Sequence, residues 1–526
     1  MTSAVVDDTG DLALHMAART VLDQCPTPLN ALEVAVVLET CGYTSTRASA
    51  LGADGLLDLG AKVLSLMSIY SSPASSAQTG PAEDPRRWTG IADFARGLVY
   101  SSPWLVSILT MVVAGVSFWS SSVAIPSVAD AVTLATALAL IVTAPFIQAF
   151  GRRASFYRGL GDQGMIVWIT RWTLELGFVV TGVSCLVFYL LRSVASRGGT
   201  PATDRLGLAA GLAIAALQVG LASFYMRGAF LSMGVIMVSG AVALVWHVEH
   251  AGAYLDPVAL IVWQLRLVAS MAAACWLLSA WWLLRVPSSG ASPLWRPSAR
   301  AVMRSVVPYA GYGLGFFALV VLPQIVSGGL LEARYSFNPS FTLTSGVALV
   351  VLVPLLARTV ATTEHLLTRQ FPSSLRHWKV AEIGGFRREM RRYWRGQLAT
   401  ALGFGVVSGL VVVFGAPRLG VSLPLLGDLA RHQGLLAACA VGYVLLGLGL
   451  LCCQLLFSLS APTWPLAAAC GGCASLFVAS GATMSDGATA AAAVGLVAAA
   501  GVFAVIALLG AHRAFSRADL AYYRTF

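Results

Sequence analysis

The stretch ALALIVTAPF at residues 137–146 has a counterpart, VALVVLVPLL, at residues 347–356, and each contains a proline, Pro145 or Pro354. Both stretches lie inside longer apolar segments, of which the 526-residue chain has twelve. Crossing about 30 Å of hydrocarbon takes about 20 helical residues, and each segment is close to that length or longer. The sequence therefore predicts an all-α polytopic membrane protein.

Composition supports this class, because 57% of the residues are hydrophobic and only 11% are charged. The net charge of +10 would indicate nucleic acid as a partner of a soluble protein. Here the arginines flank apolar segments, so orientation and lipid contact explain them better, and we expect no nucleic-acid partner. The twelve predicted spans are 98–119, 125–149, 165–191, 206–225, 229–248, 257–284, 302–327, 339–359, 397–416, 434–457, 463–481 and 488–511.

Basic residues are distributed unequally between the two sets of connecting segments. The segments on the same side as the N-terminus carry 23 lysines and arginines. The opposite segments carry six, Arg192, Arg197, Arg205, Arg334, Arg418 and Arg431. Cytoplasmic loops are enriched in basic residues, so both termini are expected in the cytoplasm of a bacterial cell, with the spans in its inner membrane.

Four regions are predicted along the chain. Residues 1–70 have helical apolar spacing and form a small cytoplasmic helical domain, and the Ser- and Pro-containing residues 71–95 form a linker. Residues 96–290 and 291–526 each contain six spans. The regions thus predict two six-helix lobes preceded by a small domain.

Sequence similarity between the halves supports a duplication. After the paired stretches quoted above, LGFVVTG at 176–182 corresponds to LGFGVVSG at 402–409. Six spans per half keep corresponding helices parallel, which predicts a pseudo-two-fold axis along the membrane normal and a cavity that rocking lobes expose to each side in turn. The expected hinge residues lie in the first span of each lobe, and they are Pro103, Pro308, Gly311 and Pro323. The alternative is that these glycines only permit close helix packing.

The segment GLVYSSPWLVSIL (97–109) resembles the opening of the first span in the Pel exopolysaccharide transporter family, with its small-Ser-Pro-Trp pattern before an aliphatic run. A basic loop with a tyrosine, FGRRASFYR (150–158), and an aromatic tail, YYRTF (522–526), are similar too. That family lies within the superfamily of oligosaccharide-lipid flippases, polysaccharide exporters and multidrug extruders. The resemblance implies export of a polysaccharide or its lipid-linked precursor.

Ionisable residues inside spans are candidates for function, because each costs about 2.5–3.5 kcal/mol on insertion scales. Arg266, with Gln264 beside it in the sixth span, could bind a phosphate or an acidic sugar in the cavity. Alternatively, Arg266 extends to the outer interface beside Trp263. Asp130 is the candidate for coupling to H⁺ or Na⁺, unless it lies among the outer headgroups.

Other candidates have an ordinary structural alternative. Arg171 and Glu175, spaced i, i+4, could gate the cavity or form a structural ion pair. Arg304 could meet a lipid diphosphate or anchor the seventh span at the interface. Tyr309 and Tyr312 could stack on sugar rings or serve as interfacial aromatic anchors.

No catalytic motif, cofactor motif or convincing metal site is present, since the sequence lacks a Walker loop and an HExxH helix. His247 and His250 have metal-compatible spacing, but solvated side chains are the better interpretation. We therefore expect no enzyme, no cofactor and no bound metal.

The predicted function is an exporter or flippase for a polysaccharide or lipid-linked oligosaccharide, working by alternating access. The alternatives are a small-molecule or multidrug antiporter, a membrane glycosyltransferase, and a membrane scaffold. Expected partners are the glycan, anionic membrane lipids and a glycosyltransferase or synthase complex.

Overall fold

The computed structural model describes residues 7–24, 31–70, 94–95, 97–99, 102–118, 126–159, 163–195, 201–251, 256–285, 299–329, 335–366, 370, 374, 383–419, 429 and 431–518. Contacts divide the chain into two compact units. The N-terminal unit comprises Met1–Ile91 with His365–Phe386, and the membrane unit comprises Ala92–Glu364 with Arg387–Phe526. The domain bounds predicted from sequence remain a prediction, and the inclusion of residues 365–386 with the N-terminal helices is a feature that the sequence did not indicate.

The N-terminal unit is built from short helices around an apolar centre. These are α1 (Asp7–Gln24), α2 (Ala31–Thr40), α3 (Ser45–Ala50) and α4 (Leu56–Tyr70). Val21, Val34, Leu38, Leu59 and Val63 are fully buried in this centre, because they recur at helical spacing on the facing sides of α1, α2 and α4. Residues 1–70 therefore carry their own hydrophobic core, as a compact domain requires.

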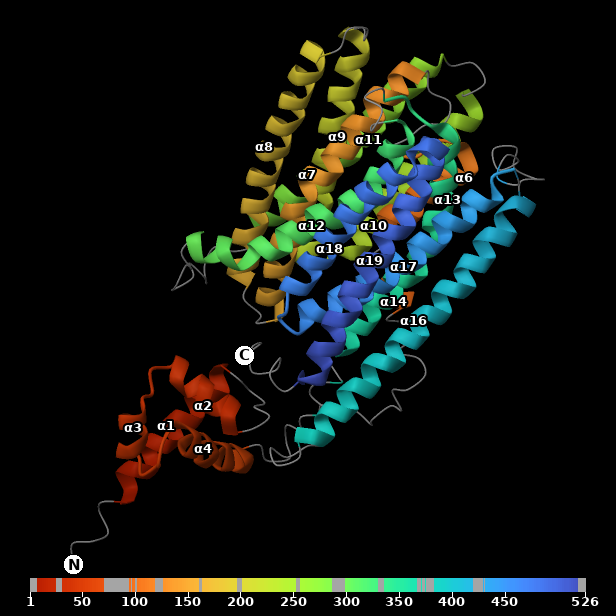
Figure 1. Cartoon of the computed structure of the whole chain (residues 1–526). Coiled ribbons are helices and arrows are strands. Elements are labelled where there is room, and N and C mark those ends of the chain that lie inside the picture. Colours follow the sequence, from red (N-terminus) through yellow and green to blue (C-terminus); the bar gives the residue numbers. More distant parts are fainter. Residues whose placement is uncertain are drawn as a thin grey trace, which may run out of the picture. The chain divides into compact units, whose positions relative to one another are not determined.

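The membrane unit has the all-helical, polytopic architecture that the sequence predicts (Figure 1). Eleven of its described helices are long and apolar enough to cross a membrane, and α6 is a twelfth, shorter apolar helix. In the first half they are α6 (Ser102–Ala114), α7 (Pro126–Gly159), α8 (Gln163–Ala195), α9 (Pro201–Arg227), α10 (Phe230–Ala251) and α11 (Pro257–Arg285). In the second half they are α12 (Ala299–Ser327), α13 (Pro339–Ala348) with α14 (Leu352–His365), α16 (Ile383–Leu419), α17 (Gln433–Ser458), α18 (Thr463–Ala482) and α19 (Ala488–Ser516).

Proline marks the start of several of these helices. Pro126, Pro201, Pro257 and Pro339 are the first residues of α7, α9, α11 and α13. The N–H groups in the first turn of a helix have no carbonyl partner within the helix. Proline therefore loses no hydrogen bond at this position, and its ring presets the backbone angle φ. Local sequence chemistry thus fixes where these helices begin.

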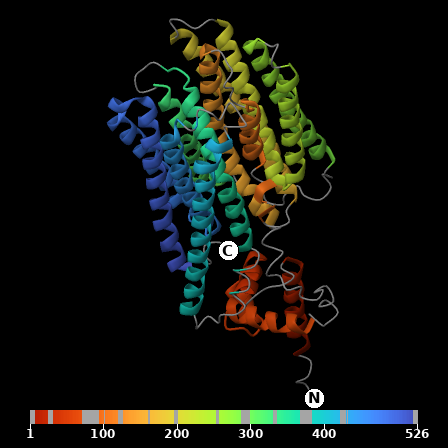
Figure 2. The ribbon, with the colours of Figure 1, turned by 90° about the vertical axis from the view of Figure 1, so that its right-hand side faces the viewer.

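Helix pairing repeats between the two halves. In the first half α6 packs on α10, α7 on α9, and α9 on α11. The corresponding pairs of the second half also pack, which are α12 on α18, α13 on α17, and α17 on α19. Figure 2 shows the two groups of helices side by side, with the first half in orange to yellow-green and the second in green to blue. The pairing supports a duplicated helical bundle, as the paired sequence stretches suggest.

The two related prolines have different local effects. Pro145 lies inside α7, which continues through it, whereas a 3₁₀ turn at Leu349–Val351 precedes Pro354 and separates α13 from α14. Pro354 has no N–H to donate to the carbonyl four residues earlier, that of Val350. The α-helical hydrogen-bond pattern is interrupted there, and the chain forms the tighter 3₁₀ turn. The helix α12 is continuous through Pro308 and Pro323, so these two expected hinge residues do not interrupt it in this conformation.

Candidate functional site

The two halves meet along a seam formed chiefly by α7 and α12, with α6 contacting α13 and the 3₁₀ turn beside it. The helices α7 and α12 approach each other closely at Gly313. A Cβ atom at that position would lie 2.7 Å from the carbonyl oxygen of Ala144 and 2.7 Å from Cγ of Gln148. Only a residue without a side chain allows this approach, so Gly313 sets the distance between the halves here.

One end of α7 is joined to the second half through Asp130. Its carboxylate accepts a hydrogen bond from the backbone N–H of Phe337, in the segment that leads into α13. Asn338, the next residue, caps α13 by accepting from the N–H of Phe341, and its amide donates to Thr489 at the start of α19. Asp130 therefore contacts a segment that is itself anchored within the second half.

The other end of α7 is joined to the second half through Arg152. A guanidinium N–H of Arg152 donates to the carbonyl oxygen of Phe457 over 2.9 Å. Phe457 lies in the last turn of α17, where its carbonyl also accepts from the N–H of Ser460 and where the helix end carries partial negative charge. Arginine is well suited to this position, because it supplies both a donor and a positive charge.

The helices of the seam carry buried hydroxyl groups between these two ends. On α6 and α7 they belong to Ser107, Thr110, Thr133, Thr136 and Thr143, and on α13 to Thr342, Thr344 and Ser345. Thr143 and Thr110 bond to carbonyls of their own helices, while the Ser107 hydroxyl has no partner among the described residues. These groups can donate and accept hydrogen bonds without carrying charge. The Ser345 hydroxyl shares a hydrogen bond with the hydroxyl of Tyr443 on α17, within the second half.

Arg266 and Gln264 lie on opposite sides of α11. Gln264 is buried and donates a hydrogen bond to the carbonyl oxygen of Ser117, within the first half. Arg266 is exposed on the same stripe as Leu277 and Leu284, which are 70% and 87% exposed. Exposed leucines at helical spacing are typical of a lipid-facing surface. This placement supports the interfacial alternative for Arg266, and the structure does not bring the two residues together.

Arg171 and Glu175 form the expected ion pair, with 2.8 Å between Nε and Oε1. Their side chains are 73% and 58% exposed, and they share an outward stripe of α8 with Val179 and Val183. The structural interpretation of this pair fits that position better than a gate does. The side chain of Arg304 lies outside the described residues.

Tyr309 and Tyr312 converge on Phe457, with ring centroids 4.9 Å away in each case. Tyr312 is fully buried and also stacks on Phe316 and Phe503. It therefore belongs to the core of the second half in this conformation. Tyr309 is half-buried on the turn of α12 before it, beside the residue that Arg152 contacts.

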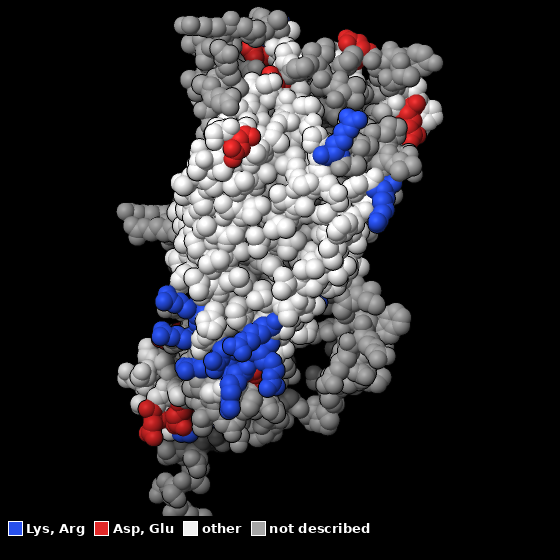
Figure 3. Space-filling view, turned by 45° about the vertical axis from the view of Figure 1, so that its right-hand side comes forward, with Lys and Arg blue, Asp and Glu red and all other residues white. Residues whose placement is uncertain are grey.

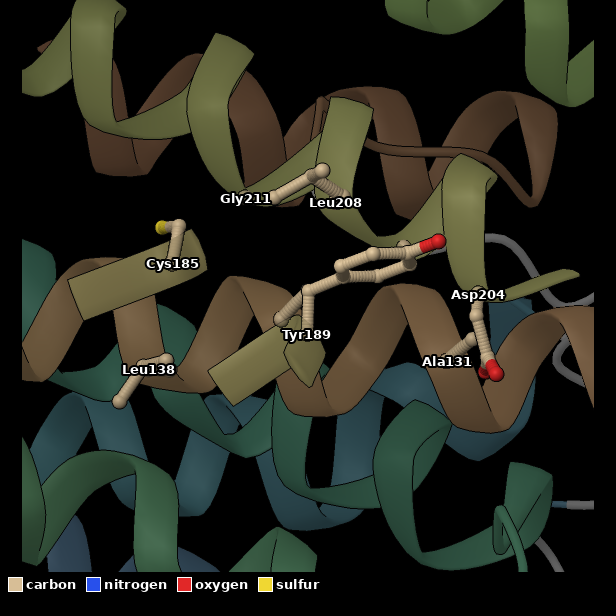
Figure 4. Close-up of a pocket in the computed structure, with 9 residues that line it drawn as sticks. Ala131, Leu138, Cys185, Tyr189, Asp204, Leu208 and Gly211 are labelled. Atoms are coloured by element: carbon tan, nitrogen blue, oxygen red, sulfur yellow. The ribbon is translucent and has the colours of Figure 1, made fainter. Parts of the chain in front are cut away.

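A pocket of about 10 Å³ lies within the first half between α7, α8 and α9 (Figure 4). The ring of Tyr189 lies across it, and the Asp204 carboxylate is directed toward Ala131. Asp204 is buried, in the first turn of α9. The volume is enough for about one water molecule, so this pocket does not accommodate a sugar or a drug.

Charge is segregated along the membrane unit. Figure 3 shows a band of uncharged side chains, with most of the visible basic residues gathered at one end of it and fewer near the other. The exposed arginines in the first turns of α16 are Arg388, Arg392 and Arg395. Arginines beside an apolar belt are typical of an interface with anionic headgroups. Among the residues that the structure describes, no group of three His, Cys, Asp or Glu side chains could hold a metal ion.

Structural comparison places this architecture among known transporter folds. A crystal structure of MATE in the bent conformation matches with a TM-score of 0.53 and 15% identity, over 82% of this chain and 95% of that one. An outward-facing multidrug resistance MATE family transporter of the MOP superfamily matches with a TM-score of 0.54 and 17% identity, over 81% and 95%. No protein-family model and no curated protein matches the chain.

A third match is a MOP superfamily transporter from Pyrococcus furiosus, with a TM-score of 0.53 and 16% identity, over 81% of this chain and 95% of that one. Its structure was described as having a binding pocket of reverse polarity that suggests a different function. At these identities the matches show the fold. The chain is a multi-pass integral membrane protein with the fold of MATE transporters of the MOP superfamily.

Proposed function

We propose that this protein is a transporter that moves a polysaccharide or a lipid-linked oligosaccharide across the cytoplasmic membrane by alternating access. The observation that carries the proposal is the seam, where two duplicated halves meet along α7 and α12 and are joined at both ends of α7, by Asp130 and by Arg152. Alternating access requires two rigid halves with breakable contacts on each side of a central passage. The two hydrogen bonds lie near opposite ends of α7, where such contacts would be needed.

The seam also supports the choice of cargo. Its helices carry uncharged buried hydroxyl groups among mainly apolar side chains, and such hydroxyl groups could pair with the donors and acceptors of a glycan. The first-span segment GLVYSSPWLVSIL resembles that of Pel exopolysaccharide transporters, and this favours a glycan or its lipid-linked precursor. The arginines beside the apolar belt would face cytoplasmic anionic lipid, with both termini on that side of a bacterial inner membrane. A glycosyltransferase or synthase complex is the proposed protein partner.

The second candidate function is small-molecule antiport, and the fold match to a multidrug resistance MATE transporter favours it.

Reconstitution into liposomes separates the two functions. A fluorescent lipid-linked oligosaccharide should become accessible to a membrane-impermeant quencher on the opposite leaflet, while ethidium should not be accumulated or expelled under a pH or sodium gradient. Ethidium transport without oligosaccharide translocation would contradict our proposal and establish the antiporter.

A further inference from the structure

Arg227 is the last residue of α9 and lies between two aromatic rings. Its guanidinium carbon is 4.7 Å from the centroid of Phe224 and 4.9 Å from the centroid of Trp282 on α11. Gly228, at φ +74°, then ends α9, and its neighbour Ala229 donates to the carbonyl of Phe224. The two rings thus restrict the orientation of the guanidinium at the C-terminal end of α9.

Hydrogen bonds fix one edge of this guanidinium. Nε donates to the carbonyl oxygen of Ser223 over 3.0 Å, and Nη2 donates to the hydroxyls of Ser223 and Ser279 over 3.2 and 3.0 Å. Both serines are fully buried, between α9 and α11. Arginine has five N–H donors, so the two donors of Nη1 have no partner among the described residues.

The positive charge of Arg227 has no carboxylate partner in the part of the chain that the structure describes. The sequence gives a reason, since no Asp or Glu occurs between Asp204 and Glu249, or between Asp256 and Glu332. A second arginine, Arg285, ends α11 and lies 4.2 Å from the ring centroid of Trp281. Two cations at adjacent helix ends repel each other unless an anion neutralises them.

The surroundings of the two arginines are apolar and face outward. Trp281 is 52% exposed, and Leu277 and Leu278, one turn deeper along α11, are exposed as well. Tryptophans at this depth are typical of the membrane–water interface, and exposed leucines beyond them face acyl chains. A ligand here would therefore be amphiphilic, with its anionic group at the arginines and its chains along α11.

We infer that the ends of α9 and α11 form a binding site for the phosphate of an anionic membrane phospholipid. The Nη1 donors of Arg227 and the guanidinium of Arg285 bind the phosphate oxygens, and Trp281 and Leu277 contact the glycerol and acyl region. The inference rests on the membrane location of the chain and does not depend on its cargo. A site at this place would stabilise the packing of α9 on α11, because Ser223 and Ser279 join the two helices beneath Arg227.

Native mass spectrometry of the full-length protein in detergent tests this site. With phosphatidylglycerol we expect specific lipid adducts that Arg285→Gln and Arg227→Lys each weaken by about tenfold, since a charged hydrogen bond is lost in either case. Arg517→Gln, an exposed arginine elsewhere on the membrane unit, is the matched control and should bind as the wild type does. Arg285 is exposed, so its substitution should not prevent folding.

Two further ligands identify the source of the phosphate. Phosphatidylcholine, which has the same phosphate diester but no net charge, should bind at least tenfold more weakly than phosphatidylglycerol. Inorganic phosphate alone should not compete at millimolar concentration. Equal binding of phosphatidylglycerol by the wild type and both variants would overturn the site, and effective competition by inorganic phosphate would overturn its assignment to a lipid. Translocation is not measured, so either result is independent of the proposed transport function.

Discussion

The side chain of Arg152 on α7 donates a 2.9 Å hydrogen bond to the backbone carbonyl of Phe457 on α17, which joins helices of opposite halves. Asp130, near the other end of α7, accepts from the N–H of Phe337 in the second half. α7 is thus tied to the second half at both of its ends, and its middle packs on α12 at Gly313. The alternating access that we propose would require these two contacts to release in turn.

The first prediction concerns the Arg152 contact. Arg152→Gln keeps a polar side chain but removes the charge and the reach to the Phe457 carbonyl, so the halves should part more readily at that end. The lost charged hydrogen bond of a half-buried side chain corresponds to roughly 1 kcal/mol, or about a fivefold change in population. Hydrogen–deuterium exchange in α12 around residues 306–313 should become faster.

Arg513→Gln is the control, because Arg513 lies 5.5 Å from the ring centroid of Trp464 within the second half and does not join the halves. Exchange that is unchanged in Arg152→Gln, or equally faster in the control, would remove Arg152 from the contact between the halves.

The second prediction uses two glycines of α12 that are two residues apart and therefore lie on different sides of the helix. Gly313→Ala places a Cβ 2.7 Å from the Ala144 carbonyl oxygen, a backbone atom that cannot move without separating the helices. Gly311→Ala instead meets Cδ1 of Leu466, the end of a flexible side chain in the same half. Overpacking against backbone costs about 1–3 kcal/mol, so Gly313→Ala should impair transport at least tenfold and Gly311→Ala should not.

The measurement is translocation of the labelled substrate in proteoliposomes, with protein amount and folding checked by size-exclusion chromatography. If Gly311→Ala proved the more damaging of the two, the close approach at Gly313 would not control the separation of the halves.

The arrangement of spans could be predicted because its causes are local. The length of the apolar segments predicted the helices, and the proline at the first position of helices such as α7 and α11 is a local feature of the same kind. The direction that a charged residue faces was harder to predict. Arg266 was a candidate ligand because it is a charge within a span, yet its spacing from Leu277 and Leu284 already placed it on an apolar outward stripe.

The contacts between halves could not be predicted in the same way. Arg152 bonds to a backbone carbonyl and Asp130 to a backbone N–H, and a main-chain partner leaves no residue type to recognise in the sequence. Arg227 was counted only as one of many basic residues near the membrane. The absence of Asp and Glu between Asp204 and Glu249 was visible in the sequence, and it would have marked Arg227 as a candidate anion-binding residue.

The third prediction distinguishes two roles for Asp130, acceptor and ion-coupling group. Asp130→Asn keeps a carbonyl oxygen that can accept from the Phe337 N–H but cannot take up a proton or carry charge. Asp130→Ala removes the acceptor and leaves that N–H without it, at a cost of about 1–3 kcal/mol. We expect the Asn variant to translocate substrate within about twofold of the wild type and the Ala variant to lose most activity. Loss of gradient-driven transport in both variants would instead assign the coupling role to Asp130.

The fourth prediction concerns the N-terminal unit and pH. The pKa of Asp58 is lowered from its ordinary value, first because its carboxylate accepts from the backbone N–H of Asp54, and then because Lys62 lies 3.1 Å away. A lowered pKa in the folded state means that the contribution to stability is present above the unfolded pKa of about 3.9, and is lost as the pH falls through the folded value. Asp58→Asn should therefore increase hydrogen exchange at the Asp54 amide at pH 6, relative to wild type at the same pH.

That difference should shrink as the pH falls through the lowered pKa of the folded wild-type carboxyl, because the wild type then also loses its carboxylate charge. Exchange measured at matched pH cancels the intrinsic pH dependence of the chemistry, and Glu39→Gln, an exposed carboxyl in α2, serves as the control. A difference between Asp58→Asn and wild type that did not change as the wild-type carboxyl was titrated would show that the carboxylate charge does not hold the turn between Asp54 and Asp58.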